Sequence, residues 1–376
     1  MKIVHLPNTH WYQQSLIRAL RETGVAVDPR DWGWGTYLPD ALPGVLAAQP
    51  DVVHLHWPEA WCRQAVHGLF PRLVRRIRLL AAGRTGDRER WLRETTGALE
   101  HIRSAGIRLV WTLHNLRPHG AAGEELAAAD QLYRAVAERA DGAIHHSRWG
   151  EAQAQAAYAF RPGCRHAVIP FGVFPDEAPA DLTPAAARRD LDLPPAGLVL
   201  LTVGTIGPRK NLELLVDAVA GLPNSDCRLL VVGGGSPSEL NPLAARGGPR
   251  VRFLGRLDQA GLSRTVRAAD FLLYAPDPEQ LTSGGPHTSE TFLKPQLTTD
   301  TPYAREVLGD TALYFEPTVA GLQEALRQAR RLIESAPEEY QARIARLAAR
   351  RQTHGWPDVA RAIAALYESL RTDLRP

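Results

Sequence analysis

Residues 198–220 read LVLLTVGTIGPRKNLELLVDAVA, and this stretch contains the two patterns that decide the fold. The apolar run 198–204 ends in a glycine, which is typical of a buried parallel strand. After a turn, residues 211–220 carry apolar side chains at helical spacing. A strand followed directly by an amphipathic helix indicates a parallel sheet with helices packed on its faces.

The same alternation extends in both directions and gives two sets of about six strands. Two sets indicate an α/β fold with two Rossmann-like domains rather than one large sheet. A single barrel is the alternative, and a proline-rich break between the sets argues against it. The other predicted strands are residues 2–6, 25–28, 51–57, 108–113, 142–146 and 167–170 before this stretch, and 228–233, 251–255, 271–275, 296–299 and 312–315 after it.

The proline-rich break sets the predicted domain limits. Five prolines lie between residues 174 and 197, so we expect a first domain at 1–174, a linker at 175–196 and a second domain at 197–355. Residues 356–376 should form a helix that either closes the second domain or crosses back to the first. Two domains facing across a cleft suit an enzyme with two substrates.

Composition restricts the class of protein. The chain has 376 residues, 44% of them hydrophobic and 23% charged, which is enough for two or three folded domains. A net charge of +3 requires neither a nucleic acid nor a membrane, and we predict no nucleic-acid partner. Three separated cysteines argue against a disulfide framework or a zinc site. The N-terminal apolar run is too short for a signal peptide, so we expect a cytosolic protein, free or on the inner face of the membrane.

Three loops of the second domain predict an anion site. The turn after residue 204 ends in Arg209 and Lys210 at a helix start, where amides, the helix dipole and cations favour a diphosphate. A solvated turn with two surface cations is the alternative. A second glycine-rich turn at residues 233–236 suits a nucleotide ribose. The third loop, residues 276–286, offers hydroxyls and amides to phosphate oxygens, although simple helix capping also explains it.

The strand ends of the first domain are rich in histidine, tryptophan and asparagine. Indole rings beside polar side chains suit sugar recognition, because sugars need flat faces to stack on and partners for their hydroxyls. A metal site is the competing interpretation, but no HExxH or similar spacing is present, and we predict no metal. His54 and His145 are expected to be buried histidines satisfied by the backbone. The segments concerned are residues 7–13, 54–59, 111–119 and 145–148.

Taken together, these motifs resemble those of GT-B-fold, nucleotide-sugar-dependent glycosyltransferases of the family 4-like group. The resemblance covers nearly the whole chain, and the order and spacing of its motifs make it specific. The motifs are Val203-Gly204 with Lys210-Asn211-Leu212, then residues 231–234, residues 252–256, Pro302 with Glu306-Val307, and the pre-hinge sequence IPFGV at residues 169–173.

Two departures from the group matter for mechanism. Thr205 stands where the group has an arginine, and Gln280 and Thr288 stand where it has two glutamates. The missing pair argues against a retaining reaction. The segments 56–59, 111–119 and 281–284 are instead similar to a smaller group that includes the GDP-mannose:glycolipid β-1,4-mannosyltransferase of exopolysaccharide assembly.

The resemblance implies transfer of a hexose, with mannose as the first choice, from a nucleoside-diphosphate sugar to a hydroxyl of a glycan, glycolipid or small molecule. It implies no cofactor beyond this co-substrate. The alternatives are a degenerate nucleotide-sugar-binding protein or regulatory subunit, and a GT-B epimerase or phosphorylase. The implied donor-binding residues are Gly204, Arg209, Lys210, Gly233, Arg256, Thr282, Ser283, Gly284, Gly285 and Glu306.

The acceptor-side domain should supply the base of an inverting reaction, which takes the proton of the attacking hydroxyl. Glu59 is the first choice, with His119 and His10 as reserves, while His114 should bind hydroxyls of the donor sugar. The residues expected to hold the acceptor are His10, Trp11, Tyr12 and Trp57.

Residues 61–80 form the last predicted element. This stretch contains five arginines and no acidic residue, interleaved with apolar side chains at helical spacing. A basic amphipathic helix suits docking on an anionic membrane surface, where a lipid-linked acceptor would lie. A core-packing helix with solvated arginines is the alternative.

Overall fold

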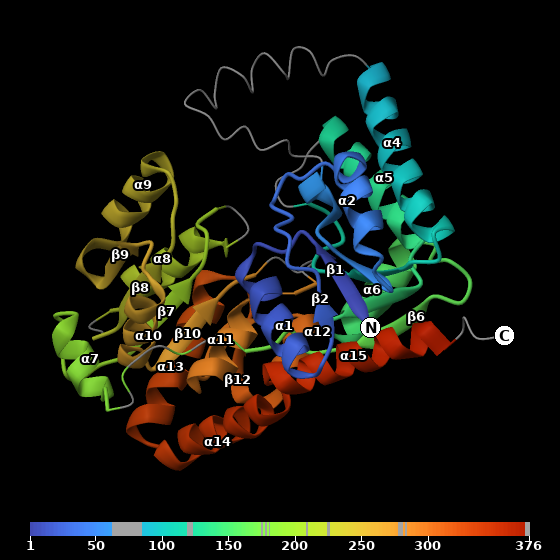
Figure 1. The fold of residues 1–376 in the computed structure, drawn as a ribbon. Coiled ribbons are helices and arrows are strands. Elements are labelled where there is room, and N and C mark those ends of the chain that lie inside the picture. The colour runs from blue at the N-terminus through green and yellow to red at the C-terminus, as the bar shows by residue number, and fades with distance from the viewer. Residues whose placement is uncertain are drawn as a thin grey trace. The chain divides into compact units, whose positions relative to one another are not determined.

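The computed structural model describes residues 1–61, 85–118, 123–173, 176, 179, 181–207, 210–223, 226–276, 281–282 and 284–372. The chain divides into two compact units (Figure 1). The first consists of Met1–Pro170 together with Trp356–Pro376, and the second is Phe171–Gly355. Each unit contains one parallel sheet with helices on both faces, so the predicted α/β class is confirmed.

Within its described residues the first unit has a six-stranded sheet in the order β2-β1-β3-β4-β5-β6. Every predicted strand is present, although β2 is short and β6 begins two residues before its predicted start. The strands are β1 (Lys2–Leu6), β2 (Ala26–Val27), β3 (Val52–His56), β4 (Arg108–Thr112), β5 (Gly142–His145) and β6 (Arg165–Val168). The helices are α1 (Trp11–Glu22), α2 (Leu38–Ala48), η1 (Pro58–Trp61), α4 (Thr85–Ser104), α5 (Gly123–Ala137), α6 (Arg148–Ala157) and α15 (Trp356–Thr372).

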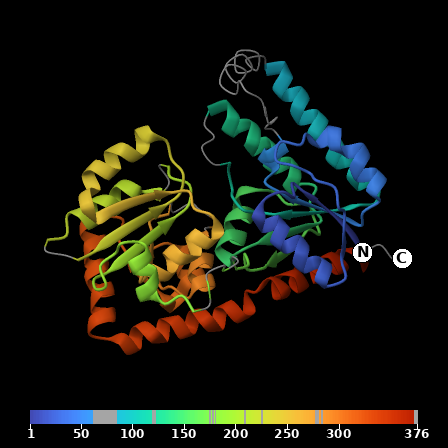
Figure 2. The same cartoon turned by 60° about the vertical axis from the view of Figure 1, so that its left-hand side comes forward.

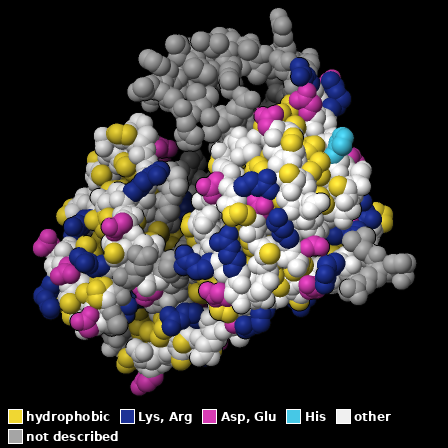
Figure 3. Space-filling model, viewed as in Figure 1, with side chains coloured by type: hydrophobic (Ala, Val, Ile, Leu, Met, Phe, Trp, Pro, Cys, Tyr) yellow, Lys and Arg dark blue, Asp and Glu magenta, His cyan; other side chains and the backbone are white. Residues whose placement is uncertain are grey.

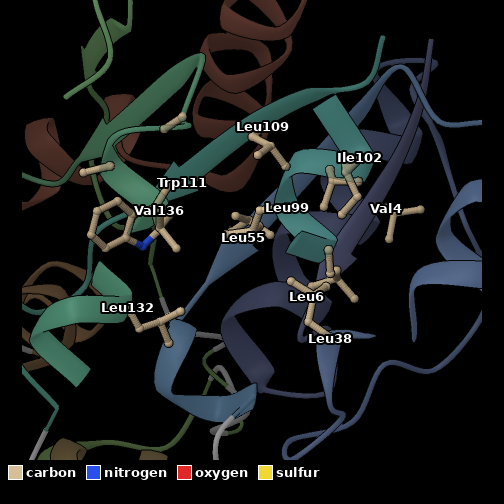
Figure 4. Close-up of a cluster of buried hydrophobic side chains, with 14 of the residues drawn as sticks. Val4, Leu6, Leu38, Leu55, Leu99, Ile102, Leu109, Trp111, Leu132 and Val136 are labelled. Carbon is tan, nitrogen blue, oxygen red and sulfur yellow. The ribbon is translucent and has the colours of Figure 1, made fainter. Parts of the chain in front are cut away.

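The core of the first unit forms where α2, α4 and α5 cover one face of this sheet. Figure 4 shows strand residues such as Leu55, Leu109 and Trp111 in one cluster with helix residues such as Leu99 and Leu132. All five side chains are nearly or fully buried, and burying each one contributes about 1.5–3 kcal/mol relative to exposure. This packing fixes β3 and β4, the two strands that carry most of the candidate site.

The C-terminal helix α15 packs on the first unit. Its apolar positions Val359, Ile363, Leu366 and Leu370 are buried, as their helical spacing predicts. α15 contacts α1, β4 and β6 (Figure 1 and Figure 2). A Cβ on Gly142 would lie 3.0 Å from Leu370, so the absence of a side chain there allows the helix to approach β5 closely.

The second unit has a six-stranded sheet in the order β12-β11-β10-β7-β8-β9 among its described residues, and all six predicted strands are confirmed. They are β7 (Val199–Val203), β8 (Arg228–Val232), β9 (Val251–Gly255), β10 (Phe271–Tyr274), β11 (Gln296–Thr299) and β12 (Ala312–Phe315). The helices are α7 (Pro184–Asp190), α8 (Leu212–Ala220), α9 (Pro237–Gly247), η3 (Gly248–Arg250), α10 (Gln259–Ala268), α11 (Gly284–Phe292), α12 (Pro302–Leu308), η4 (Gly309–Thr311), α13 (Val319–Glu334) and α14 (Pro337–Thr353).

Part of the segment expected to be a linker is folded. Residues 184–190 form α7, whose Ala187 is fully buried and whose Arg188 pairs with Asp270 at 2.6 Å. Pro184 occupies the first helical position after the N-cap Thr183, where proline lacks only a hydrogen bond that the helix would not make. The prolines therefore start a helix of the second unit here instead of only breaking the chain.

Each sheet reverses its strand order at one point, which is where open α/β sheets bind ligands. In the second unit the chain proceeds from β7 to β8 and β9 on one side and continues with β10 on the other. In the first unit the corresponding strands are β1 and β3. The candidate residues are therefore expected in the loops after these strands.

On the face shown in Figure 3, the basic side chains of the described residues lie interspersed with acidic ones. Among the residues that the structure describes, none of the helices combines the length and the apolar character needed to cross a membrane. The predicted basic helix at residues 61–80 lies almost wholly outside the described residues.

Candidate functional site

Three glycines bring the ends of β7, β8 and β9 together in the second unit. Gly204, Gly233 and Gly255 all have positive φ angles, of 126°, 153° and 70°. The Gly204 amide donates to Val232 O at 2.9 Å, and the Gly233 amide donates to Gly255 O at 2.8 Å. A Cβ on Gly233 would lie 1.9 Å from Gly204 O. Only glycine allows this approach, which places bare backbone at the carboxyl edge of the sheet.

Lys210 lies at the point where this sheet reverses its order. Its Nζ donates to Val203 O at 3.1 Å and lies 5.1 Å from the centre of the Tyr274 ring, at the end of β10. The neighbouring Asn211 donates to Ala275 O at 3.0 Å, which ties the β7 turn to the end of β10. A half-buried ammonium group is thus held beside the glycine turns, as a diphosphate site requires. Arg209, the second predicted cation, lies outside the described residues.

The other donor-side residues surround the same edge of the sheet. Arg256 follows β9, and its guanidinium lies so close over Gly234 that a Cβ there would be 2.3 Å from Arg256 Nε. Thr282 is buried after β10, and its hydroxyl makes no hydrogen bond with the described residues. Gly285 lets α11 begin against Tyr274, since a Cβ would lie 2.9 Å from that ring. Gly284 opens α11, and Ser283 is not among the described residues.

Of the two positions where the family pattern has glutamates, Thr288 is described, and Gln280 lies outside the described residues. Thr288 is buried and donates to Gly284 O at 2.8 Å, so its hydroxyl stabilises the first turns of α11. Glu290 lies near Thr288 but not at either position of the family's glutamate pair. Its carboxylate contacts Arg350 at 3.0 Å and His354 at 2.7 Å and thereby ties α11 to α14. Glu306 is exposed on α12, which follows β11. Its predicted contact with donor hydroxyls remains a prediction.

In the first unit three histidines form a hydrogen-bonded chain. His5 Nδ1 lies 3.2 Å from His56 Nε2, and His56 Nδ1 lies 3.2 Å from His114 Nε2. All three rings are at most 3% exposed. Burial, together with the positive charge of Arg21, lowers the pKa of His5 to about 3, and burial with the neighbouring histidines holds the pKa of His56 well below its usual range. His5 and His56 are therefore neutral at physiological pH.

His54 and His145 are hydrogen-bonded, but not as predicted. His54 contacts Tyr367 OH at 2.5 Å and Thr112 Oγ1 at 2.7 Å, and His145 Nε2 lies 3.0 Å from His166 Nδ1. The expectation of backbone partners was wrong for both residues. Side chains from other strands and from α15 supply the partners, and sequence spacing does not reveal such long-range neighbours.

Two groups of metal-type ligands occur among the described residues. His5, His54 and His56 form one group and His145, Glu151 and His166 the other, each with ligand atoms within 4.8 Å of one another. In the first group every ring nitrogen except His5 Nε2 already takes part in a hydrogen bond. These bonds explain why the histidines of this group gather without requiring an ion.

The predicted acceptor residues surround His114. Trp57 stacks on its ring at a centroid distance of 4.1 Å and an interplanar angle of 17°, and His10 meets the edge of Trp57 at 4.9 Å. Tyr12 is fully buried and meets the His114 ring edge-on at 5.0 Å, while Trp11 contacts His10 and Tyr12. The structure therefore brings together residues that are more than 100 positions apart in the chain.

Glu59 is half-buried in η1, directly after Trp57 and Pro58. Its Oε2 accepts a hydrogen bond from Tyr133 OH of α5 at 2.5 Å. One carboxylate oxygen is thus held by a buried phenol, and this fixes the orientation of the group. His119, the reserve base, lies outside the described residues.

Tyr133, Tyr367 and His5 take part in the site but were not predicted from the sequence, whereas His146 lies in the predicted segment 145–148. His146 Nδ1 donates to Ile169 O at 3.0 Å, and the His146 ring lies 5.2 Å from His114. His5 could have been found from strand pairing, because β1 and β3 are neighbours and His5 lies opposite His54. The two tyrosines lie in helices and carry no local signal.

Comparison with known proteins shows which class of protein has this fold. Residues 185–348 match the family model described as "Glycosyl transferases group 1". The sucrose-phosphate synthase from Thermosynechococcus elongatus superposes with a TM-score of 0.68 at 19% identity, covering 99% of this chain and 100% of that one. Anabaena Alr3699/HepE, solved with UDP and glucose, superposes with a TM-score of 0.69 at 17% identity, covering 98% and 100%. The chain therefore has the GT-B glycosyltransferase fold, and its second unit carries a group 1 glycosyl transferase domain.

Two proteins related in sequence add to this comparison. The D-inositol 3-phosphate glycosyltransferase of Streptomyces griseus is 32% identical over 278 residues, 66% of this chain and 55% of that protein. The phosphatidyl-myo-inositol mannosyltransferase of Mycobacterium tuberculosis is 35% identical over 99 residues, 26% of each chain. The chain thus spans about half the length of the inositol phosphate glycosyltransferases that it matches.

Proposed function

We propose that the chain is an enzyme that transfers a hexosyl group from a nucleoside-diphosphate sugar to an acceptor hydroxyl. The observation that carries the proposal is the position of Lys210. Its ammonium group lies beside Gly204 and Gly233 at the reversal point of the second sheet, inside the domain that matches the group 1 model. Cations and free amides at such a point bind diphosphates.

The proposed chemistry assigns donor binding to the second unit and acceptor activation to the first. The acceptor oxygen attacks the anomeric carbon, its proton passes to Glu59, and the bond from that carbon to the diphosphate breaks. Lys210, Arg256 and the backbone amides stabilise the negative charge of the leaving diphosphate. His114 binds a hydroxyl of the transferred sugar, and Trp57 with His10 forms a surface for the acceptor. We propose that turnover needs no divalent cation.

The names of the relatives support a choice of substrates to test first. The Mycobacterium tuberculosis relative is a phosphatidyl-myo-inositol mannosyltransferase, and the Anabaena structure contains UDP and glucose. We propose GDP-mannose as the first donor and UDP-glucose as the second, with inositol-containing, glycan and lipid-linked acceptors.

A nucleotide-sugar-binding protein without turnover is the second candidate. It is favoured by one observation: Thr288 replaces a glutamate of the family pattern, and its hydroxyl is used within α11. Binding of donor without release of the nucleoside diphosphate in the presence of any acceptor would support this candidate.

Lys210→Ala tests the donor site directly. Losing a charge-assisted contact to phosphate should weaken nucleoside-diphosphate binding by about 1.5–3 kcal/mol, measured by isothermal titration calorimetry. Lys294→Ala is a poor control because the Lys294 ammonium caps α10 through Ala269 O at 2.6 Å. Lys2→Ala, a change in the first unit, is the better control and should leave the affinity unchanged. Equal affinity in wild type and Lys210→Ala would show that the turn has been misassigned.

Location at a membrane surface is a separate proposal that rests on the sequence of residues 61–80. We expect the protein to sediment with phosphatidylglycerol-containing liposomes at low salt, since each arginine near anionic lipid contributes about 1 kcal/mol. The variant with Arg72, Arg75 and Arg76 changed to Glu should remain in the supernatant. Absence of sedimentation by the wild type at low salt would favour a soluble acceptor.

A further inference from the structure

One tryptophan of the first unit lies at the surface beside the residues that are proposed to hold the acceptor. Trp34 is 37% exposed, which makes it one of the few large apolar side chains among the described residues that the fold leaves in contact with solvent. Its one ring contact among those residues is with Trp57, at a centroid distance of 5.4 Å and an interplanar angle of 50°. The two indoles are tilted rather than stacked, so a face of the Trp34 ring stays open to solvent.

The loop that carries Trp34 is held at both ends. Before the tryptophan, the amide of Asn8 donates to Trp32 O at 3.0 Å, and the amide of Trp32 donates to Asn8 Oδ1 at 2.9 Å. After it, Tyr37 donates its hydroxyl hydrogen to Glu94 of α4 at 2.6 Å. The loop is therefore fixed to the segment after β1 on one side and to α4 on the other.

A tight turn places Trp34 at the tip of this loop. The amide of Thr36 donates to Gly33 O at 3.1 Å, and the Thr36 hydroxyl donates to the same oxygen at 2.8 Å. Gly35 has a φ of 95°, as the third position of a type II turn requires. Trp34 occupies the second position, at the corner of the turn. The indole is thus presented to solvent on a fixed support.

The neighbouring Trp57 carries a second unfavourable feature. Its φ is 31°, in the left-handed region that bulky residues rarely adopt, and the proline that follows restricts its backbone further. Strained backbone and an exposed indole both cost free energy, and strain of this kind is concentrated at functional sites. Because both costs fall on two indoles in contact with each other, they indicate a binding surface there.

We propose that Trp34 forms a second acceptor subsite, which stacks on the sugar ring next to the one that receives the hexosyl group. The order of ring contacts gives its position. His114, which is proposed to bind the transferred sugar, stacks on Trp57, and Trp34 lies against Trp57 one ring further along. This inference rests on the proposed function and deepens it, because the preferred acceptor then contains at least two sugar rings.

A sugar ring suits this surface better than a lipid chain. Polar side chains lie next to the indoles, since His10 meets the edge of Trp57 at 4.9 Å and Glu59 follows in η1. Sugars combine a flat face for an indole with hydroxyls for such groups, whereas acyl chains offer these groups no partner.

The first test observes the Trp34 ring and needs no turnover. In the full-length protein labelled with ¹⁵N-tryptophan, the indole signal of Trp34 is identified as the one that is missing in Trp34→Phe. With GDP or UDP present, methyl β-glucoside is compared with methyl β-cellobioside, and methyl α-mannoside with methyl α-mannobioside. We expect the disaccharides to shift the Trp34 signal and the monosaccharides to leave it in place. No shift with either disaccharide, or equal shifts within each pair, would overturn the proposal.

The second test measures transfer to the same pairs of acceptors. Trp34→Ala should raise KM for the disaccharide about 3- to 10-fold, the effect of losing one aromatic contact, with kcat nearly unchanged. KM for the monosaccharide and the affinity for nucleoside diphosphate should stay at their wild-type values. Trp34→Phe keeps a flat ring and should restore most of the disaccharide KM. Val168→Ala is the matched control, because this side chain of β6 is also 37% exposed.

Equal disaccharide KM values in wild type and Trp34→Ala would contradict the subsite. So would unchanged saccharide kinetics in a Trp34→Ala protein that sediments less with phosphatidylglycerol-containing liposomes, because that result would place Trp34 at a lipid surface.

The two tests separate this inference from the proposed function. A protein without transferase activity whose Trp34 signal shifts only with disaccharides would reject the function and keep the subsite as a glycan-binding site. An active transferase whose preference between the two acceptors of a pair does not depend on Trp34 would keep the function and reject the subsite.

Discussion

The glycine turns of the second unit and the histidine chain of the first are built in opposite ways. The turns depend on backbone: Gly233 fits against the carbonyl oxygen of Gly204 only because Gly233 carries no side chain. The histidine chain depends on side chains from β1, β3 and the loop after β4, which meet only when the sheet has formed. Local sequence therefore specifies the first site, while the second is specified by strand pairing.

The largest effect is expected where the backbone approach is closest. Gly233→Ala would place a Cβ 1.9 Å from Gly204 O at a φ of 153°, so it should destabilise the second unit by about 3 kcal/mol or more. Nucleoside-diphosphate binding should be lost with it. Denaturation followed by far-UV circular dichroism, together with calorimetric titration, measures both effects.

Gly207→Ala is the control for this change, because a Cβ there has nothing within 4 Å and the φ is not in the left-handed region. Stability and binding close to wild type in both variants would mean that the close approach of the two turns does not form in solution.

The second prediction concerns the side-chain site. Glu59→Gln should lower kcat at least ~10²-fold, the usual effect of losing a general base, while donor affinity stays normal. The amide oxygen of glutamine still accepts from Tyr133 OH, so packing is preserved. Tyr133→Phe keeps the carboxylate but removes the bond that orients it, and it should have a smaller effect. Full turnover in Glu59→Gln would remove this residue from the mechanism.

These contrasts explain which parts could be predicted from the sequence. All twelve strands follow from short apolar runs, since burial on both faces of a parallel sheet leaves that mark. The turns around Gly204 and Gly233 can likewise be predicted from the local sequence. The bonds of Glu59 to Tyr133 and of His54 to Tyr367 span 74 and 313 positions, and no local pattern encodes them. Pro184 was wrongly assigned to a linker, because proline is common both in linkers and at the first position of helices.

The third prediction uses pH to distinguish the stability of the first unit from that of the second. Burial lowers the pKa of His5 and of His145 to about 3 and that of His146 to about 4, from 6.5 in the unfolded chain. At pH values between the lowered pKa values and 6.5, the unfolded state binds more protons than the folded state. The contribution of these histidines to stability is therefore fully present above pH 6.5 and decreases as the pH falls. Each of these histidines contributes a slope of up to about 1.4 kcal/mol per pH unit.

All nine tryptophans lie in the residues of the first unit, so tryptophan fluorescence reports on that unit alone. We expect the urea midpoint of unfolding, followed by tryptophan fluorescence, to decrease between pH 7 and pH 5. The urea midpoint for the loss of nucleoside-diphosphate binding, which reports on the second unit, should decrease less over the same range. Equal shifts of the two signals would show that the histidines do not make the first unit more sensitive to acid.

The most direct test of the central claim is a transfer assay with the purified chain in EDTA. GDP-mannose and UDP-glucose are supplied with inositol-containing and lipid-linked acceptors, and both the released nucleoside diphosphate and the anomeric configuration of the product are recorded. The account predicts acceptor-dependent release without added metal and a product of inverted configuration. Donor binding without release for every acceptor, or activity that appears only after Mn²⁺ or Mg²⁺ is restored, would contradict it.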